Sequence, residues 1–381
     1  MSSARFLDKL LGGVAVEWTV LGDERFIEVA NAARRPVKAS LRVTGKTPYY
    51  GANNIQDYVN GYTHDGEYIL IAEDGSASLE NYSIQYATGK FWANNHVHVV
   101  RGKQWLNTKF LYHYLHIVDF IPYLANKDRS KLTKGEMVKI PLPVPCPENP
   151  RKSLEIQVEI VRILDTFTEL TAELTAELAA RKKQYKHYRD QLLSFDDREV
   201  EWKTMGQVAE IGTGSHDTQD AIEDGDYIFY ARGREPLKLN VFDFDETAII
   251  TAGDGAGVGK VFHYAQGKYA LHQRAYRIVP GPLVEPRFVY HWLASHFYGY
   301  IQKASVSSSV TSLRRPMFLN FPIPVPSLTE QSRIVAILDK FDVLTNSVSE
   351  GLPHEIELRQ KQYAYYRDLL LSFPKPEAVE A

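Results

Sequence analysis

The segment that most resembles a catalytic or nucleotide-binding motif is a glycine-rich string, AGDGAGVGK, at Ala252–Lys260. A phosphate-binding loop has glycine five positions before Gly259, where Asp254 stands, and Ser or Thr after the lysine, where Val261 stands. The GxGxxG pattern of dinucleotide sites also fails, because Lys260 occupies its third glycine position counted from Gly255. A glycine-rich turn after a strand therefore explains the string better than a nucleotide site.

The histidines do not form a recognisable catalytic or metal-binding set. His113 and His116 share the face of a predicted helix, without further ligands at a familiar metal spacing. Cys146 is the single cysteine, which excludes internal disulfides and multi-cysteine zinc sites. His113 recurs as His291, which favours a structural hydrogen bond. Motifs for a Ser or Cys nucleophile, and the Asn-Pro-Pro-aromatic segment of base amino methylation, are missing. The sequence predicts a recognition protein, not an enzyme, with no metal.

Composition limits the class of protein. The 381 residues suffice for two or three domains, and 44% hydrophobic with 24% charged residues is typical of a globular protein. Neither a secretory signal nor an apolar run long enough to cross a membrane is visible, so a cytoplasmic location without membrane insertion is expected. The net charge is -3 and no segment is strongly basic, so any nucleic acid must be held by local clusters.

Several segments occur twice in the same order, which identifies two copies of one unit. Val16 corresponds to Val200 and Ile163 to Ile337, so the copies are offset by nearly half the chain. The pairs are VEW and VEW, YATGK and YAQGK, FLYHYL and FVYHWL, IPLPVP and FPIPVP, ILDTF and ILDKF, and KKQYKHYRDQLLSF and QKQYAYYRDLLLSF. Such duplication predicts a pseudo-two-fold molecule, although it could merely enlarge one fold.

Each copy reads as an α+β domain followed by a long helix. Glu67–Ala72 and Thr247–Ala252 are predicted strands that end in Asp-Gly turns, and the YATGK and YAQGK pieces are interpreted as hairpin turns. Phe110–His116 and Phe288–His296 are predicted helices. The proline-rich segments cannot join a central strand, because alternate residues lack an N–H, and they mark the exit from each domain.

The two long helices carry a heptad-like apolar seam. The stretch from Gln331 to Gln362 is one tetrad longer than the matching stretch from Gln157 to Gln184. Pro353 predicts a kink or short break in the second helix. Two antiparallel helices of about 40 residues, roughly 60 Å long, are expected to form a coiled-coil spacer between two similar mixed α/β domains. The expected regions are 1–145 and 198–326 as domains, 146–197 and 327–375 as helices, and 376–381 as a tail.

Polar loops at matching places in the two copies are candidates for DNA contact. Cations and hydroxyls suit phosphates, and Asn, Arg and Lys suit base edges. The alternative is that these loops are simply solvated. The predicted contacts are Lys46, Tyr49, Tyr50, Asn53, Asn54, Lys127, Arg129, Lys131, Lys134, Arg232, Arg234, Lys303, Ser307, Ser308, Ser309, Thr311, Arg314 and Arg315.

The whole chain resembles the specificity subunit of type I restriction-modification enzymes (HsdS). The features that carry this resemblance are the duplicated unit, the proline-rich exits, the ILDTF and ILDKF helices and the paired KQY endings. The TAELTAEL tetrads, Thr171–Leu178, are similar to those of its type IC group. The departure is Gly351–Pro353, which puts a smooth second helix in doubt.

The resemblance implies that each domain is a target-recognition domain reading one half of a bipartite site in double-stranded DNA. The chain would bind no cofactor itself. The helices would set the gap and dock two methylation subunits (HsdM), which use S-adenosylmethionine, and restriction subunits (HsdR), which use ATP and magnesium, would join them. The spacer and docking residues would be Leu170, Leu174, Leu178, Tyr185, Tyr188, Leu344, Val348, Leu352, Tyr363 and Tyr366. Two rival readings are a coiled-coil protein scaffold and a self-sufficient methyltransferase.

Overall fold

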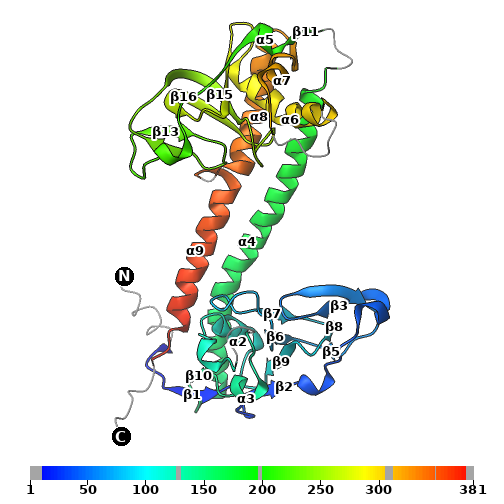
Figure 1. Ribbon diagram of the computed structural model, residues 1–381. Helices are drawn as coiled ribbons and strands as arrows, with labels where there is room; N and C mark the ends of the chain where they lie inside the picture. Colours follow the sequence, from blue (N-terminus) through cyan, green and yellow to red (C-terminus); the bar gives the residue numbers. More distant parts are fainter. Residues whose placement is uncertain (1–10, 126–129, 196–199, 305–311, 348, 375–381) are drawn as a thin grey trace. The chain divides into compact units, whose positions relative to one another are not determined.

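The chain divides into two compact units. The computed structural model describes residues 11–125, 130–195, 200–304, 312–347 and 349–374 (Figure 1). Unit 1 comprises residues 1–174 and 356–381, and unit 2 comprises residues 175–355. None of the helices in the described ranges combines the length and apolarity that crossing a membrane requires.

Unit 1 is built on two four-stranded sheets and a short helix. One sheet is antiparallel, and in the other β3 and β8 run parallel. The helix α2 (Thr108–Leu115) begins at Asn107, whose side chain accepts hydrogen bonds from the backbone N–H groups of Lys109 and Phe110. The strand order of the first sheet is β2 (Ile27–Val29), β9 (Val97–Gly102), β6 (Tyr68–Ala72) and β7 (Ile84–Ala87), and that of the second is β4 (Ile55–Val59), β3 (Thr44–Tyr50), β8 (Lys90–Ala93) and β5 (His64–Asp65).

Unit 2 holds the corresponding strands in one six-stranded mixed sheet. The helix α6 (Pro286–Ala304) follows this sheet in the chain as α2 follows the sheets of unit 1. The strand order is β12 (Ala209–Thr213), β17 (Ala275–Pro280), β15 (Phe244–Ala252), β16 (Phe262–Leu271), β13 (Tyr227–Tyr230) and β14 (Leu237–Leu239). The predictions of an α+β class, of two similar mixed α/β domains and of strands and helices at the repeated segments are confirmed.

The interpretation of YATGK and YAQGK as hairpin turns is wrong. In unit 1, β7 pairs with β6 while β8 pairs with β3 and β5, so the two strands around Gly89 belong to different sheets. In unit 2, β16 continues through Gly267 as one ten-residue strand. Gly89 and Gly267 have φ of +68° and +78°, which only glycine adopts readily. These glycines therefore bend the chain locally without reversing it.

The proline-rich segments form the edges of small ribbons. β10 (Pro141–Pro145) pairs antiparallel with β1 (Val16–Val20), and β18 (Pro322–Val325) pairs with β11 (Glu201–Thr204). A two-stranded ribbon requires N–H groups along one side of each strand only, so alternate prolines are tolerated. The prediction that these segments stay out of a central strand is confirmed, and the repeated VEW segments are their pairing partners.

The long helices differ between the two copies. α4 (Pro150–Leu192) is continuous over 43 residues, whereas the second helix consists of α8 (Leu328–Asn346) and α9 (Gly351–Leu371). The predicted break is confirmed, but it lies before Gly351, and Pro353 falls in the first turn of α9, where a missing N–H costs little. Four residues separate α8 from α9, which equals the extra tetrad of the second copy.

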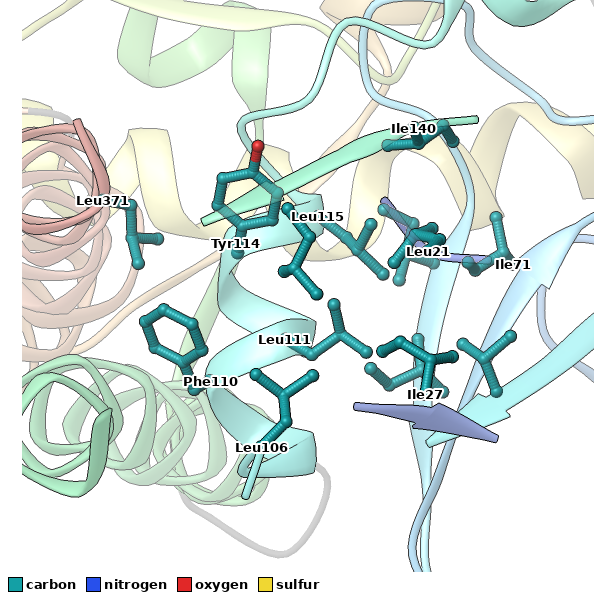
Figure 2. Packing of buried hydrophobic residues seen from close by; sticks show 14 of the residues in the cluster. Leu21, Ile27, Ile71, Leu106, Phe110, Leu111, Tyr114, Leu115, Ile140 and Leu371 are labelled. Carbon is teal, nitrogen blue, oxygen red and sulfur yellow. The ribbon is translucent and has the colours of Figure 1, made fainter. Parts of the chain in front are cut away.

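The core of unit 1 lies between α2, the first sheet and the end of α9. Figure 2 shows Phe110 and Tyr114 of α2 near Leu371 of α9, while Leu21, Ile71 and Ile140 lie on the other side of Leu111 and Leu115. All of these side chains are buried. Unit 2 repeats the arrangement, with Phe288, Leu293 and Phe297 of α6 in one core with Leu193 and Leu338. Each sheet domain is therefore anchored to helix by a continuous apolar core.

Gly351→Ala should lower the thermal unfolding midpoint. Gly351 has φ of +76°, a conformation that costs other residues about 1–2 kcal/mol, and its Cβ would overlap the Val343 carbonyl oxygen. The matched control is Gly299→Ala within α6, where a Cβ meets nothing within 4 Å. The control should raise the midpoint, because alanine favours a helix by about 1 kcal/mol. A Gly351→Ala midpoint at or above wild type would contradict a tightly built helix break.

Candidate nucleic-acid interface and helix junctions

A buried histidine joins the sheet domain of unit 1 to both of its long helices. The Nε2 of His113 on α2 lies 2.9 Å from Oδ1 of Asp165 on α4, and Nδ1 lies 3.0 Å from the hydroxyl of Tyr363 on α9. Because a carboxylate only accepts, Nε2–H donates to Asp165 and Nδ1 accepts from Tyr363. Burial lowers the pKa of His113, which favours this neutral ring. Lys109 completes the group, with Nζ 2.7 Å from the other oxygen of Asp165.

Unit 2 contains the same junction with an arginine in place of the lysine. The Nε2 of His291 on α6 lies 2.7 Å from Oδ1 of Asp339 on α8, and Arg287 donates from Nε and Nη2 to the same carboxylate at 3.0 and 2.6 Å. Burial by itself would raise the pKa of Asp339, but the hydrogen bonds from His291 and Arg287 lower it to about 2. The carboxylate is therefore ionised at neutral pH, and the prediction of structural hydrogen bonds for His113 and His291 is confirmed.

A buried glutamine makes a second repeated contact at each junction. Gln157 on α4 accepts from the N–H of Asn107 at 2.7 Å and donates to the carbonyl of Trp105 at 3.2 Å. Gln331 on α8 accepts from the N–H of Glu285 at 2.7 Å and donates to the carbonyl of Leu283 at 3.1 Å. Each glutamine thus holds the loop that leads into α2 or α6.

The roles of these glutamines and of Asp165 and Asp339 were missed by sequence reasoning. Their signal was present in the repeat, since the ILD segments and both glutamines recur at matching places. What sequence lacks is the partner, because each contact joins residues about 50 positions apart.

The predicted seam residues lie along the long helices, with tyrosines in ring contacts. Tyr185 and Tyr188 stack on Phe341 with centroids 5.9 and 5.6 Å apart, and Tyr366 stacks on Phe167 at 5.2 Å. Tyr188 and Tyr366 stay 38% and 36% exposed. Leu170, Leu174, Leu178, Tyr185, Leu344, Leu352 and Tyr363 are partly buried, and Val348 lies outside the described residues.

Of the predicted DNA contacts, one is contradicted by its burial. Tyr49 is 1% exposed, and its hydroxyl accepts from the N–H of Val37, so it is a core residue that cannot reach DNA. Burial also raises the pKa of the half-buried Tyr50. Lys46, Asn53, Asn54, Lys131, Lys134, Arg232, Arg234, Lys303, Arg314 and Arg315 are exposed, while Lys127, Arg129, Ser307, Ser308, Ser309 and Thr311 lie outside the described residues.

Internal bonds limit two of the exposed amides. Asn53 donates to the carbonyl of Gly75 and accepts from the N–H of Ala77 and the hydroxyl of Ser83. Its side chain thus holds a loop in place. The Oδ1 of Asn54 accepts from the N–H of Ile55.

The structure brings Arg232 and Arg234 together with the glycine-rich string. Both arginines line a hollow of about 520 Å³ with Asp254, Gly255, Gly257 and Lys260. No group of three or more His, Cys, Asp or Glu side chains suited to a metal occurs among the described residues. With Arg232, Arg234 and Lys260 against Asp254, the lining of this hollow is basic, and positive charge is what contact with nucleic-acid phosphates requires.

A family model described as the type I restriction modification DNA specificity domain matches residues 16–181 and again 198–358. The chain belongs to this family. It is the DNA specificity subunit of a type I restriction-modification system, a recognition component and not a catalytic one.

Two relatives match this specificity subunit over all or nearly all of its length. A Haemophilus influenzae protein named provisionally as a type I restriction enzyme specificity subunit is 44% identical, over 97% of this chain and 98% of that protein. The EcoR124I/EcoR124II specificity subunit of Escherichia coli is 37% identical over 100% of both chains. A crystal structure of the type I S subunit from M. genitalium shares the fold, with a TM-score of 0.66 and 15% identity, over 96% of this chain and 97% of that one.

Asp165→Ala should loosen α2. The substitution leaves the buried Nε2–H of His113 without its acceptor, which costs about 1–3 kcal/mol. Hydrogen exchange of the α2 amides in the intact chain should become faster, while α6 in unit 2 serves as the internal reference. Asp190→Ala is the control, because this aspartate is exposed on α4 and pairs with Arg189 at the surface. Unchanged exchange in α2 would show that the junction contributes little.

Proposed function

We propose that this specificity subunit reads a bipartite DNA site, with one half contacted by each unit. The target-recognition domains would be residues 1–145 and 198–326, and residues 146–197 and 327–375 would form an antiparallel pair of spacer helices, followed by a tail at 376–381. The observation that carries this proposal is the repeated junction, since each unit separately attaches its own sheet domain to helix by the same Gln, His and Asp contacts.

We further infer that the helices dock two methylation subunits. Tyr188 and Tyr366 occupy matching places in the repeat, stack on matching phenylalanines and keep over a third of their surface exposed. A half-exposed aromatic is suited to a protein interface. The methylation subunits would use S-adenosylmethionine, and restriction subunits using ATP and magnesium would join the complex. This chain itself would bind none of these cofactors.

The gap between half-sites is proposed to depend on α4. Its tetrad region, Thr171–Leu178, belongs to an unbroken helix, whereas the extra tetrad of the second copy is matched by the four residues between α8 and α9. A tetrad added to α4 would therefore lengthen that helix, whereas the extra tetrad of the second copy adds no helical length. The tetrads support assignment to a type IC-like group.

Co-expression with a methylation subunit from the same type of system should produce adenine methylation at one bipartite motif. Sequencing of modified bases across the genome of the host would give both half-sites and the gap. A protein-interaction scaffold that does not bind DNA predicts no such motif. Methyl transfer by the purified chain alone would instead favour a self-sufficient methyltransferase.

Deletion of Thr175–Leu178 should shorten the gap and leave both half-sites unchanged. Four helical residues span about 6 Å, compared with about 3.4 Å per base-pair step, so the expected change is one or two base pairs. The control keeps the length and changes the chemistry, by combining Thr175→Ala with Glu177→Ala. The control should methylate the wild-type motif. An altered half-site in the deletion variant would argue against a role of α4 in spacing.

A further inference from the structure

Each unit has a turn at the end of an antiparallel pair of strands, and the two turns are equivalent. In unit 1, β6 pairs antiparallel with β9, and Ala72 lies opposite Val97. In unit 2, β15 pairs antiparallel with β17, and Ala252 lies opposite Ala275. These pairs are the last of β6 and β15 and the first of β9 and β17. They therefore fix which residues correspond at this edge of the two sheets.

At this edge both units have an aspartate, but the residue that bonds to the aspartate differs between them. Asp74 and Asp254 each stand two residues after the paired alanine, while His96 and Arg274 each stand one residue before the opposite strand. The Nδ1 of His96 lies 2.5 Å from Oδ1 of Asp74, and Nη1 of Arg274 lies 3.1 Å from Oδ2 of Asp254. The same frame thus holds a histidine in unit 1 and an arginine in unit 2.

The backbone of this turn is fixed in the same way in both units. The N–H of His96 donates to Oδ1 of Asn94 at 2.8 Å, and the N–H of Arg274 donates to Nδ1 of His272 at 2.9 Å. Asn94 and His272 are both buried. The side chains of His96 and Arg274 are 48% and 64% exposed. Each unit therefore projects one exposed side chain from a rigid, internally bonded turn.

Unit 2 adds a second cation to this frame. The Nη1 of Arg232 lies 3.0 Å from Oδ1 of Asp254, so one carboxylate orients two guanidinium groups. In the parallel pairs, Tyr50 lies opposite Ala93 and Tyr230 opposite Leu271, which makes Ala52 the counterpart of Arg232 in unit 1. Ala52 has no polar group to offer. The two frames therefore differ in two side chains.

The glycine-rich string is the scaffold of this group. A Cβ on Gly253 would lie 2.6 Å from the carbonyl oxygen of Arg274, and one on Gly257 would lie 2.7 Å from that of Arg232. Only glycine lets the loop approach both arginine-bearing segments and set Asp254 between them. Asp254 borders two hollows, of about 520 and about 280 Å³, with Arg232 lining the first and Arg274 the second.

Protein stability does not account for the Asp254 ion pairs or for the hydrogen bond between His96 and Asp74, because exposed polar pairs contribute little to it. Orientation does: a guanidinium held by a carboxylate presents its remaining N–H groups in a fixed direction, as bidentate contact with a guanine edge requires. A histidine bonded through Nδ1 presents Nε2 to one base-edge atom. A different side chain on the same frame is what two different half-sites would demand.

We propose that positions 96 and 274 are equivalent base-reading positions of the two units, positioned by Asp74 and Asp254, with Arg232 as a second reader in unit 2. This inference rests on the proposed function, in which each unit reads its own half-site. Arg274 and Arg232 would select guanine in the half-site of unit 2. His96 would contact a base edge in the half-site of unit 1.

Reciprocal substitutions test the proposal through the sequence of the methylated motif. Arg274→His and His96→Arg, each co-expressed with the methylation subunit, should change letters in one half-site only, and the half read by the other unit is the internal reference. Discrimination at the affected base pair should fall on the order of 10-fold or more. Asp254→Asn should relax the same half-site as Arg274→His, because it releases both guanidinium groups. Lys203→Ala, at a surface ion pair with Glu201, should leave the motif unchanged.

A second variant separates base reading from folding and from phosphate contact. Arg274→Lys keeps the charge but loses the planar fork, and it should relax the same position while the complex still co-purifies with the methylation subunit. Unchanged letters in both half-sites, or uniformly weaker methylation with the letters retained, would overturn the proposal. A wild-type chain that yields no bipartite motif would instead refute the proposed function.

Discussion

The arrangement of each unit depends on a buried bond between a histidine of the sheet domain and an aspartate of a long helix. His113 with Asp165, and His291 with Asp339, are charge-assisted contacts in which the imidazole is almost wholly excluded from water. Apolar packing alone tolerates small rotations, whereas an unmet buried N–H costs free energy as soon as the geometry slips. The contact therefore fixes the orientation in which the domain sits on its helix.

The two long helices differ in continuity, and this difference decides whether added residues lengthen the helix. In α4 each residue adds a constant rise, so its length follows from its residue count. In the second helix the four additional residues coincide with a break, and Gly351 allows the chain to fold closely against the end of α8. The number of residues from Gln331 to Gln362 thus overstates the helical length. Proline alone, the feature visible in the sequence, located this break only approximately, since Pro353 is accommodated inside α9.

The sequence predicted the elements whose signal is local or repeated. Two α+β domains, the exclusion of the proline-rich segments from a central strand, the long helices and the structural role of His113 and His291 followed from periodicity and from duplication. The hairpin reading of YATGK failed because strand pairing is set by distant partners, as β7 and β8 join different sheets. Tyr49 was mistaken for a DNA contact because tyrosine suits both a core and a surface, and burial is decided by the fold.

In a duplicated specificity subunit, the residues that recognise DNA are the hardest to find from the sequence. Recurrence between the copies marks residues that build the common frame, such as Gln157 and Gln331. Residues that distinguish two DNA half-sites must differ between the copies, so the repeat conceals them. His96 and Arg274 correspond only through strand register, and they become comparable because Asp74 and Asp254 occupy one place in the frame. A fixed frame with exchangeable side chains lets specificity change without disturbing the junction that orients each domain.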